Sequence, residues 1–421
     1  LSGSPTLTTT DTLVSFDGDV SGAGALTVAS GTGGLTFGST VGNGVNITSL
    51  DTTGTTGNIT LTGNLDSDGT VLFNGPVLLA ADATITTSDD LVTFSDTLDN
   101  AQNLVVATGS GGVTFTGIVG ATPLTTLDTT GTTGTITLGA NVNTTGAQTY
   151  VGPVSFNSDI ALNVTGGTDF DDISFGDTVT STADSLDINV AGSGDVTFGD
   201  GSGTDTVSGI NALTVDGNAI TVNTPVSATS IVFQGANSSG DQLTIASGGS
   251  LSTTGLVTIG AANDTTEIET VSLSGNISSD SDTDGGDLSI LSNSGGSATV
   301  TFASSGLTLS AGAGQISAGN INFSAGGNSP TFLSDGGVSW NQLTASSGTL
   351  TLAPVTAGTA INVAGSGGYA ISDSTLDGIA NEFTKVTIGN SSAGSVSIGA
   401  GEALNTTDAG GGARTWDLEI I

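Results

Sequence analysis

The sequence predicts an all-β protein, and among all-β folds it favours a parallel β-helix (β-solenoid) with coils of roughly 21 residues. Three observations predict this fold: a repeated unit of about 78 residues, a shorter beat of apolar-x-Phe triplets inside it, and Gly-rich segments between the triplets. The alternative is a string of tandem β-sandwich domains, because a unit of this length is also close to a small immunoglobulin-like domain.

The long repeat is clearest in the string LDTTGTTG, which occupies residues 50–57 and returns at residues 127–134. Upstream of these strings, LTVASGTGGLTF at 26–37 aligns with LVVATGSGGVTF at 104–115. Downstream, a looser third copy begins at DDISFGDTV (171–179). Such self-similarity is typical of stacked repeats, in which each unit buries its apolar face only against its neighbours.

We therefore expect one continuous β-solenoid segment over residues 1–421. Its repeat units are expected at approximately 6–83, 84–164 and 165–240, with a divergent remainder at 241–421. Because the chain contains no Met, Leu1 is not a translation start, and we interpret the sequence as a fragment of a longer protein.

The shorter repeat is defined by the spacing of Phe residues. Eleven of the fourteen Phe residues end an apolar-x-Phe triplet, and nine of these triplets have Thr, Ser or Asn in the middle. This alternation is typical of a strand with one buried face, so each Phe is expected to point inward. Four intervals between successive triplets have the same length, as from Phe94 to Phe115, so Phe side chains of successive coils are expected to stack. The triplets end at positions 16, 37, 73, 94, 115, 156, 175, 198, 233, 302 and 323.

Gly-rich segments such as SGTGG (30–34) and GSGG (109–112) separate the triplets. Gly, Asn and Asp tolerate the positive φ angles of tight corners, so these segments are expected to be the turns of each coil. No segment shows a sustained i, i+3, i+4 apolar stripe, which argues against long helices. A β-sandwich gives no reason for the recurring interval between Phe residues, so this interval favours the solenoid.

The composition limits the function. The chain has 39 acidic residues (Asp and Glu together), one Lys, one Arg, and no His or Cys, which gives a net charge of −37. This charge cannot neutralise nucleic-acid phosphates and is repelled by anionic membrane surfaces, so we expect no nucleic-acid binding. The longest apolar runs, such as Val77 to Ala81, are far shorter than the ~20 residues of a membrane helix, so we expect no membrane insertion. Without His or Cys there is no imidazole base, thiol nucleophile or typical zinc site, so we do not expect an enzyme.

Calcium is the one cofactor that the sequence suggests, because this hard cation prefers carboxylate and carbonyl oxygens. In DSDTDGGD, Asp280, Asp282 and Asp284 have the i, i+2, i+4 spacing that opens a calcium loop, and Asp287 follows closely. Position twelve of that pattern is Leu291 instead of a bidentate Glu, so a complete EF-hand is excluded. The alternative is a solvated acidic corner.

A second candidate calcium site is DGSGTDTVS (200–208), which resembles one copy of a nine-residue calcium β-roll repeat. Asp200 and Asp205 would be its ligands, although that repeat shares each ion between stacked copies and occurs only once here. The Thr-x-Thr sequences also raise ice binding as a less favoured alternative, because the Thr columns are irregular.

Two segments, NTTGAQTYVGPVSF (143–156) and STLDGIANEFTKVTIGNSSAGSVSIGA (374–400), resemble the repeat region of filamentous-haemagglutinin-like proteins. These are very large bacterial surface proteins. The resemblance implies secretion, a right-handed parallel β-helix, and a role in adhesion or extracellular matrix. The chain departs from the family in having no Arg-Gly-Asp string, since Arg414 is followed by Thr415.

The expected function is that of an extracellular structural rod, part of a bacterial cell-surface fibre, sheath or adhesin stalk. Its expected partners are copies of itself, arranged end to end or laterally, because exposed strand edges recruit further strands. Two alternatives remain: an adhesin module whose Thr/Asn-lined lateral face binds glycans or a host surface, and a calcium-dependent matrix protein.

Overall fold

The computed structural model describes residues 1–235, 240–260, 268–280, 285–290, 299–323, 328–345, 347–365, 367–379, 381–399 and 415–421. These residues form two compact units, Leu1–Ile210 and Asn211–Ile421. Each unit is a parallel β-helix, which confirms the predicted fold class.

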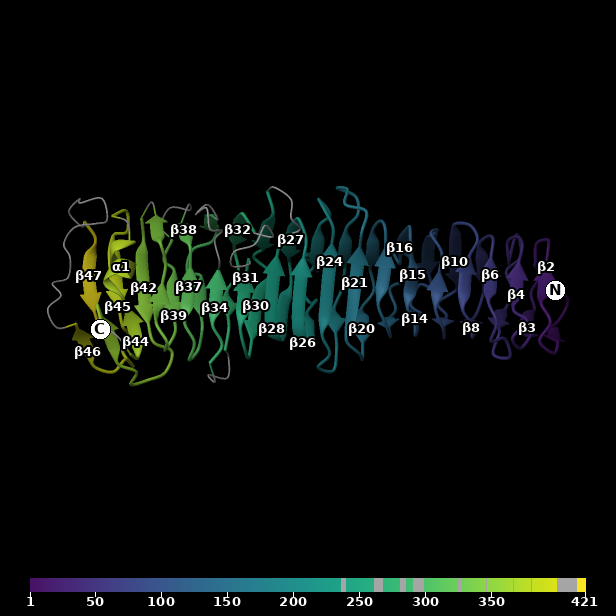
Figure 1. The fold of residues 1–421 in the computed structure, drawn as a ribbon, viewed down its shortest axis with the longest axis horizontal. Helices are drawn as coiled ribbons and strands as arrows, with labels where there is room; N and C mark the ends of the chain where they lie inside the picture. The colour runs from purple at the N-terminus through teal and green to yellow at the C-terminus, as the bar shows by residue number, and fades with distance from the viewer. Residues whose placement is uncertain are drawn as a thin grey trace. The chain divides into compact units, whose positions relative to one another are not determined.

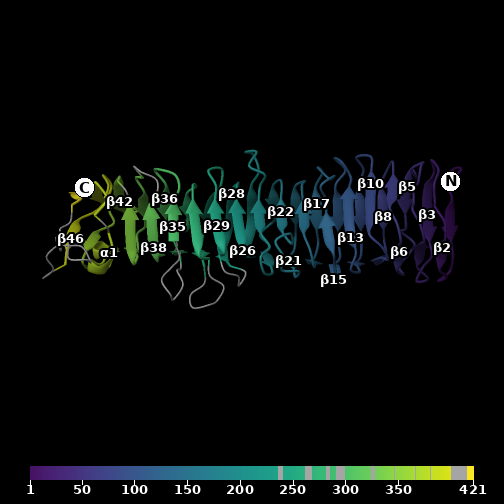
Figure 2. The same cartoon turned by 90° about the horizontal axis from the view of Figure 1, so that it is seen from above.

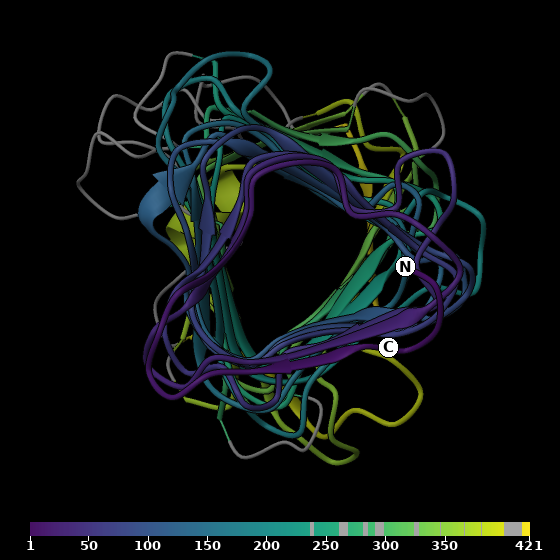
Figure 3. The ribbon, with the colours of Figure 1, turned by 90° about the vertical axis from the view of Figure 1, so that its right-hand side faces the viewer.

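Unit 1 is built from three ladders of short parallel strands, one on each side of the coil. Near the N-terminus the purple coils enclose a three-sided interior (Figure 3), and their strands follow one another in coil order (Figure 1). Strand β26 (Val207–Asp216) begins in unit 1, where Val207 pairs with Val179.

Ladder 1 consists of β1 (Thr6–Thr8), β3 (Ala25–Ala29), β5 (Ser49–Asp51), β8 (Val71–Phe73), β11 (Val92–Phe94), β14 (Val113–Phe115), β17 (Ile136–Leu138), β20 (Val154–Phe156) and β23 (Val179–Thr180). Ladder 2 consists of β2 (Val14–Phe16), β4 (Leu35–Phe37), β6 (Ile59–Leu61), β9 (Val77–Leu79), β12 (Leu98–Asp99), β15 (Val119–Leu124), β18 (Val142–Thr144), β21 (Ile160–Val164) and β24 (Leu186–Val190). Ladder 3 consists of β7 (Leu65–Ser67), β10 (Ala83–Thr87), β13 (Asn103–Ala107), β16 (Thr126–Asp128), β19 (Gln148–Tyr150), β22 (Ile173–Phe175) and β25 (Val196–Phe198).

Unit 2 repeats this plan with longer corners. Ladder 4 consists of β28 (Pro225–Gln234), β30 (Ser250–Thr253), β33 (Ile277–Ser278), β36 (Thr308–Ser310), β39 (Thr331–Leu333), β42 (Thr349–Ala353), β45 (Lys385–Ile388) and β47 (Asp417–Ile420). Ladder 5 consists of β31 (Val257–Ile259), β34 (Leu288–Ile290), β37 (Ile316–Ala318), β40 (Val338–Ser339), β44 (Tyr369–Ile371), β43 (Ile361–Val363) and β46 (Val396–Ile398). Ladder 6 consists of β27 (Ala219–Val222), β29 (Gln242–Ile245), β32 (Thr270–Leu273), β35 (Thr299–Phe302), β38 (Asn320–Phe323) and β41 (Gln342–Ala345). A single turn of helix, α1 (Asp373–Asp377), follows β44, and Ser372 is its N-cap.

The interior is filled by the alternating apolar residues of these strands. In β11, for example, Val92 and Phe94 are fully buried and Thr93 between them faces outward. Removing a Phe side chain from water contributes about 1.5–3 kcal/mol, so the repeated inward Phe residues are a main source of stability.

The Phe residues stack in short runs on different sides of the coil. Phe16 stacks on Phe37 in ladder 2, with ring centroids 5.4 Å apart. In ladder 1, Phe94 lies 5.1 Å from both Phe73 and Phe115. In ladder 3, Tyr150 takes the position of a Phe and stacks on Phe175 at 5.3 Å, and Phe198 continues this run. The predicted stacking is therefore confirmed within each run. Some irregular Phe intervals mark a change of ladder, as from Phe37 to Phe73, whereas the interval from Phe115 to Phe156 stays in ladder 1, where Leu138 lies between them.

Coil length varies around the predicted value. The coil from Val92 to its partner Val113 has the predicted length, whereas the coil from Ile136 to its partner Val154 is shorter. In unit 2, the coil from Thr270 to its partner Thr299 is longer than either. The ladders keep their register through these changes because the extra residues lie in the corners.

Candidate functional site: the polar corners and the acidic candidates

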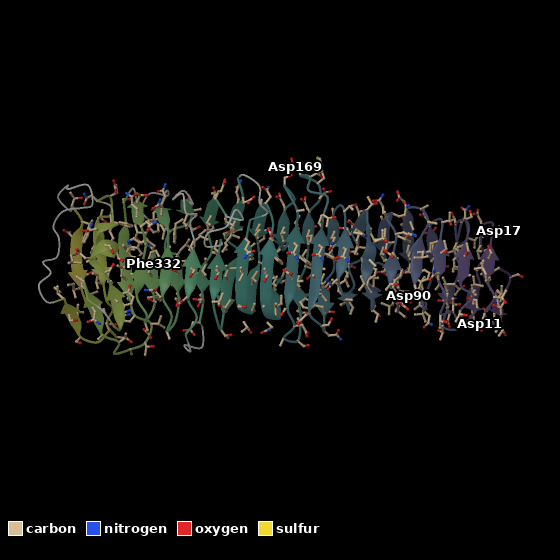
Figure 4. All side chains as sticks on the ribbon, in the orientation of Figure 1. Asp11, Asp17, Asp90, Asp169 and Phe332 are labelled. Carbon is tan, nitrogen blue, oxygen red and sulfur yellow. The ribbon has the colours of Figure 1, made fainter. Side chains whose placement is uncertain are left out.

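The corners of unit 1 are fastened by carboxylates that accept hydrogen bonds from the following coil. The Asp11 Oδ1 atom accepts from the Thr32 backbone amide at 2.9 Å and from the Thr32 hydroxyl at 3.0 Å. At the equivalent position of the repeat, Asp89 Oδ1 accepts from the Ser110 amide at 2.9 Å. Figure 4 shows Asp11 at the outer edge of the ribbon. These side chains therefore join one coil to the next.

This corner also explains two glycines of the Gly-rich segments. Gly31 and Gly109 have φ angles of +59° and +54°. A Cβ atom at Gly31 would lie 2.4 Å from Asp11 Oδ1, and one at Gly109 would lie 2.2 Å from Asp89 Oδ1. Only Gly fits both the backbone conformation and the close approach of the carboxylate.

Hydrogen bonds of this kind change the acidity of the carboxyl groups, and Asp82 provides a further example because it accepts from the Asn103 amide at 2.9 Å. The amide and hydroxyl of Thr32 lower the pKa of Asp11, and the amide and side chain of Asn103 lower the pKa of Asp82. Donors to a carboxylate stabilise its charged form, so these acids stay ionised in mild acid.

The repeated string LDTTGTTG forms a second kind of corner. In its second copy, the buried Thr132 hydroxyl donates to the Val106 carbonyl at 2.9 Å and accepts from the Thr108 amide at 3.2 Å. In the first copy, the Thr55 hydroxyl makes the corresponding bonds to Val28 and Ser30. Each string therefore supplies one buried hydroxyl that fastens its corner to the preceding coil.

Asp280 and Asp287, two of the predicted calcium ligands, also act as corner acceptors. Asp280 is almost completely buried; its Oδ1 accepts from the Gly285 amide at 3.0 Å and its Oδ2 from the Ala313 amide at 2.5 Å. Asp287 Oδ1 accepts from the Gln315 amide at 2.8 Å. The other two predicted ligands, Asp282 and Asp284, lie outside the described residues. Calcium binding at this loop stays a prediction.

The structure brings together Asp200 and Asp205, the ligands predicted for the second calcium site. Asp205 is 8% exposed and is hydrogen-bonded to Asp200. Burial, followed by the charges of Asp177 and Asp200, raises the pKa of Asp205. Hydrogen bonds from Ser202 instead lower the pKa of Asp200. The two carboxyl groups therefore differ in acidity, as expected when two acids share a site.

Neither pair is extended into a complete metal site within the described part of the chain. Among those residues, no three acidic side chains are grouped so that they could hold one metal ion. The same residues include no helix with the length and apolar character needed to cross a membrane.

One buried polar network was not anticipated from the sequence. Gln148 is fully buried, and its amide nitrogen donates to the Asn163 carbonyl at 3.0 Å and to the Thr144 hydroxyl at 3.2 Å. The Tyr150 hydroxyl donates to the Gln148 side-chain oxygen at 3.0 Å. The signal for this network is the triplet Gln-Thr-Tyr, in which both inward positions are polar or amphipathic where other triplets have apolar residues.

The fold and its corners define the class of the protein as a parallel β-solenoid. No family model matches the chain, and comparisons with curated proteins and with solved structures likewise find no match.

Proposed function

We propose that the chain is an extracellular structural element, part of a cell-surface fibre, sheath or adhesin stalk. The observation that carries this proposal is the recurrence of the same coil-to-coil fastening at equivalent positions, as in Asp11–Thr32 and Asp89–Ser110. A repeated fastening of this kind serves the solenoid itself, because each coil is stabilised only through its neighbours.

The composition supports a location outside the cell. Two cationic residues leave trypsin-like proteases only two cleavage positions in 421 residues. A surface rich in Thr, Ser, Asn and Asp remains well hydrated, which suits a protein exposed to solvent over most of its coils.

Immunogold electron microscopy of cells that produce this chain tests the proposal. We expect the label on fibres or a sheath at the cell surface, with preimmune serum as the control. Label confined to the cell interior would contradict the extracellular location, and label on freely diffusing protein alone would contradict the structural role.

A further inference from the structure

The outward face of ladder 6 in unit 2 carries two columns of uncharged side chains, and Figure 2 shows its strands β29, β35 and β38. One column contains Ala219, Gln242, Thr270, Asn320 and Gln342, and the other contains Thr221, Thr244, Ser272, Thr301, Asn322 and Thr344. Because the strands are parallel and in register, neighbouring side chains lie about 4.8 Å apart along a column and about 6.7 Å apart between columns. We call this surface the amide–hydroxyl face.

Three amides of this face, those of Gln242, Asn322 and Gln342, have hydrogen-bonding capacity that the described part of the protein does not use. Within the described part of the chain, the side chains of Gln242, Asn322 and Gln342 make no hydrogen bond. In unit 1, by contrast, Asn189 donates to Asn163 at 3.0 Å and Asn163 donates to Asn143 at 2.8 Å. Each free amide offers two donors and an acceptor, so the amide–hydroxyl face is prepared for a polar ligand.

The charge of the face restricts that ligand. Neither column contains an acidic residue, although the chain as a whole carries a net charge of −37. Asp241, next to Gln242, is buried, and the Glu269 carboxylate beside Thr270 accepts from the Gly240 amide at 2.7 Å. A polyanion would be repelled by the rest of the surface, whereas a neutral ligand can approach this strip.

Within unit 2, the amide–hydroxyl face is narrower than a standard protein–protein interface. Six strands at about 4.8 Å and two columns give a strip about 25–30 Å long and about 10 Å wide. This area is roughly a third of the ~800 Å² that each partner contributes to a standard protein–protein interface. A strip of this shape instead fits one extended polymer chain.

We propose that the amide–hydroxyl face binds one extended chain of a neutral polysaccharide. The hydroxyl groups of successive sugars exchange hydrogen bonds with the amides of Gln242, Asn322 and Gln342 and with the Thr and Ser hydroxyls between them. This binding activity goes beyond the structural role and does not depend on it.

Affinity electrophoresis of the full chain tests the proposal. Native gels contain dextran, xyloglucan, a mixed-linkage β-glucan or no polysaccharide, with alginate as the anionic comparison. We expect retardation by at least one neutral polysaccharide and none by alginate. The double variant Asn322→Asp/Gln342→Glu is expected to weaken binding by about tenfold or more, because each change removes amide donors and adds a charge.

The matched control is Thr114→Asp/Thr137→Asp, which adds the same two charges to outward positions of ladder 1. We expect this control to bind like the wild type, and circular dichroism to show the same fold for all three proteins. The proposal is overturned if no neutral polysaccharide retards the chain, or if the control loses binding equally. It is also overturned if analytical ultracentrifugation shows a wild-type dimer that Asn322→Asp/Gln342→Glu dissociates, since a second copy would then occupy the face.

Discussion

At the scale of single residues, the two Tyr side chains differ in their hydrogen bonding although both are fully buried. The Tyr150 hydroxyl donates to Gln148, whereas the Tyr369 hydroxyl has no hydrogen-bond partner within the described residues. A buried polar group without a partner is destabilising, because it has lost water and gained nothing in exchange.

We expect opposite results from removing these two hydroxyls. Tyr150→Phe should lower the free energy of unfolding by about 1–2 kcal/mol, because it leaves the buried side-chain oxygen of Gln148 without the Tyr150 donor. Tyr369→Phe should leave this free energy unchanged or raise it by about 1 kcal/mol. Urea unfolding of both variants is the measurement, and equal losses in the two would contradict the assignment.

The buried hydroxyl of Thr132 provides a second test at this scale. Thr132→Val keeps the shape of the side chain but leaves the Thr108 amide and the Val106 carbonyl without their partner. We expect a loss of about 1–3 kcal/mol in unfolding free energy. The control, Thr114→Val, changes an outward side chain of β14 and should alter stability by less than about 0.5 kcal/mol. A control loss as large as that of Thr132→Val would show that the hydroxyl is not the cause.

The Asp200–Asp205 pair allows the predicted calcium binding to be tested. If these carboxylates hold calcium, the ion should raise the melting temperature at pH 7, where a concentration of 100 times Kd adds about 2.7 kcal/mol of stability. Asp205→Asn should abolish the increase, and magnesium serves as the comparison ion. A melting temperature that is the same with calcium and with chelator would refute the prediction.

At the scale of elements, the apolar-x-Phe triplets were sufficient to predict strands. Triplets ending at Phe94 and Phe115 became β11 and β14 with the expected inward Phe and outward Thr. The side of the coil on which a triplet lies could not be predicted, because corner lengths vary and only the paired register determines it. The long interval from Phe37 to Phe73 therefore hides a change from ladder 2 to ladder 1.

The acidic candidates were harder to predict for a related reason. The spacing of Asp280 and Asp287 within their own loop suggests a metal site. Gly285, in the same loop, donates to Asp280, but each carboxylate also accepts from the following coil, from Ala313 and Gln315 respectively. A local pattern cannot reveal a partner in another coil when coil lengths are irregular. The repeat could have revealed the Asp11–Thr32 pair, because Asp89–Ser110 recurs at the equivalent position of the next repeat unit.

Strand β45 offers a test of how firmly one element is held. Lys385 pairs with Thr349 and Asp417 on its two sides, and its ammonium forms an ion pair with Glu419 at 2.7 Å. Trypsin needs an unfolded segment around the Lys385–Val386 bond, so we expect the native protein to resist cleavage there. Glu419→Gln should accelerate the cleavage modestly, because an exposed ion pair contributes little. Mass spectrometry of the digest identifies the cut; rapid cleavage of the wild type would contradict the pairing of β45.

At the scale of the whole molecule, the negative charge makes the stability depend on pH. At neutral pH the 39 acids repel one another, and this repulsion opposes folding. Asp172 and Asp205 also oppose folding at neutral pH. Burial, and then the charges of nearby carboxylates, raises the pKa of each. Their ionisation is less favourable in the folded state, so it reduces stability as pH rises above the ordinary value of 3.8.

Three acids that accept hydrogen bonds from the following coil act in the opposite direction: Asp11 accepts from Thr32, Asp19 from Ser39 and Asp82 from Asn103. The pKa values of Asp11, Asp19 and Asp82 are lowered below 3.8 by hydrogen-bond donors, so their contribution is present above that pH and is lost as pH falls through their folded-state values. We therefore expect stability to rise from pH 7 to a maximum near pH 4–5 and to fall below pH 3.8. Urea unfolding between pH 7 and pH 2 is the measurement. Stability that falls steadily from pH 7 downward would contradict this balance.

The corner between ladders 2 and 3 has one further consequence. Three residues connect β18 to β19, eight connect β21 to β22 and five connect β24 to β25, yet all three coils keep their strand register. The eight-residue connection carries Phe170 at 85% exposure, and its neighbour Asp169 projects from the ribbon (Figure 4). A foreign peptide grafted between Asp169 and Phe170 would thus be displayed on a scaffold that already accommodates extra chain at this corner.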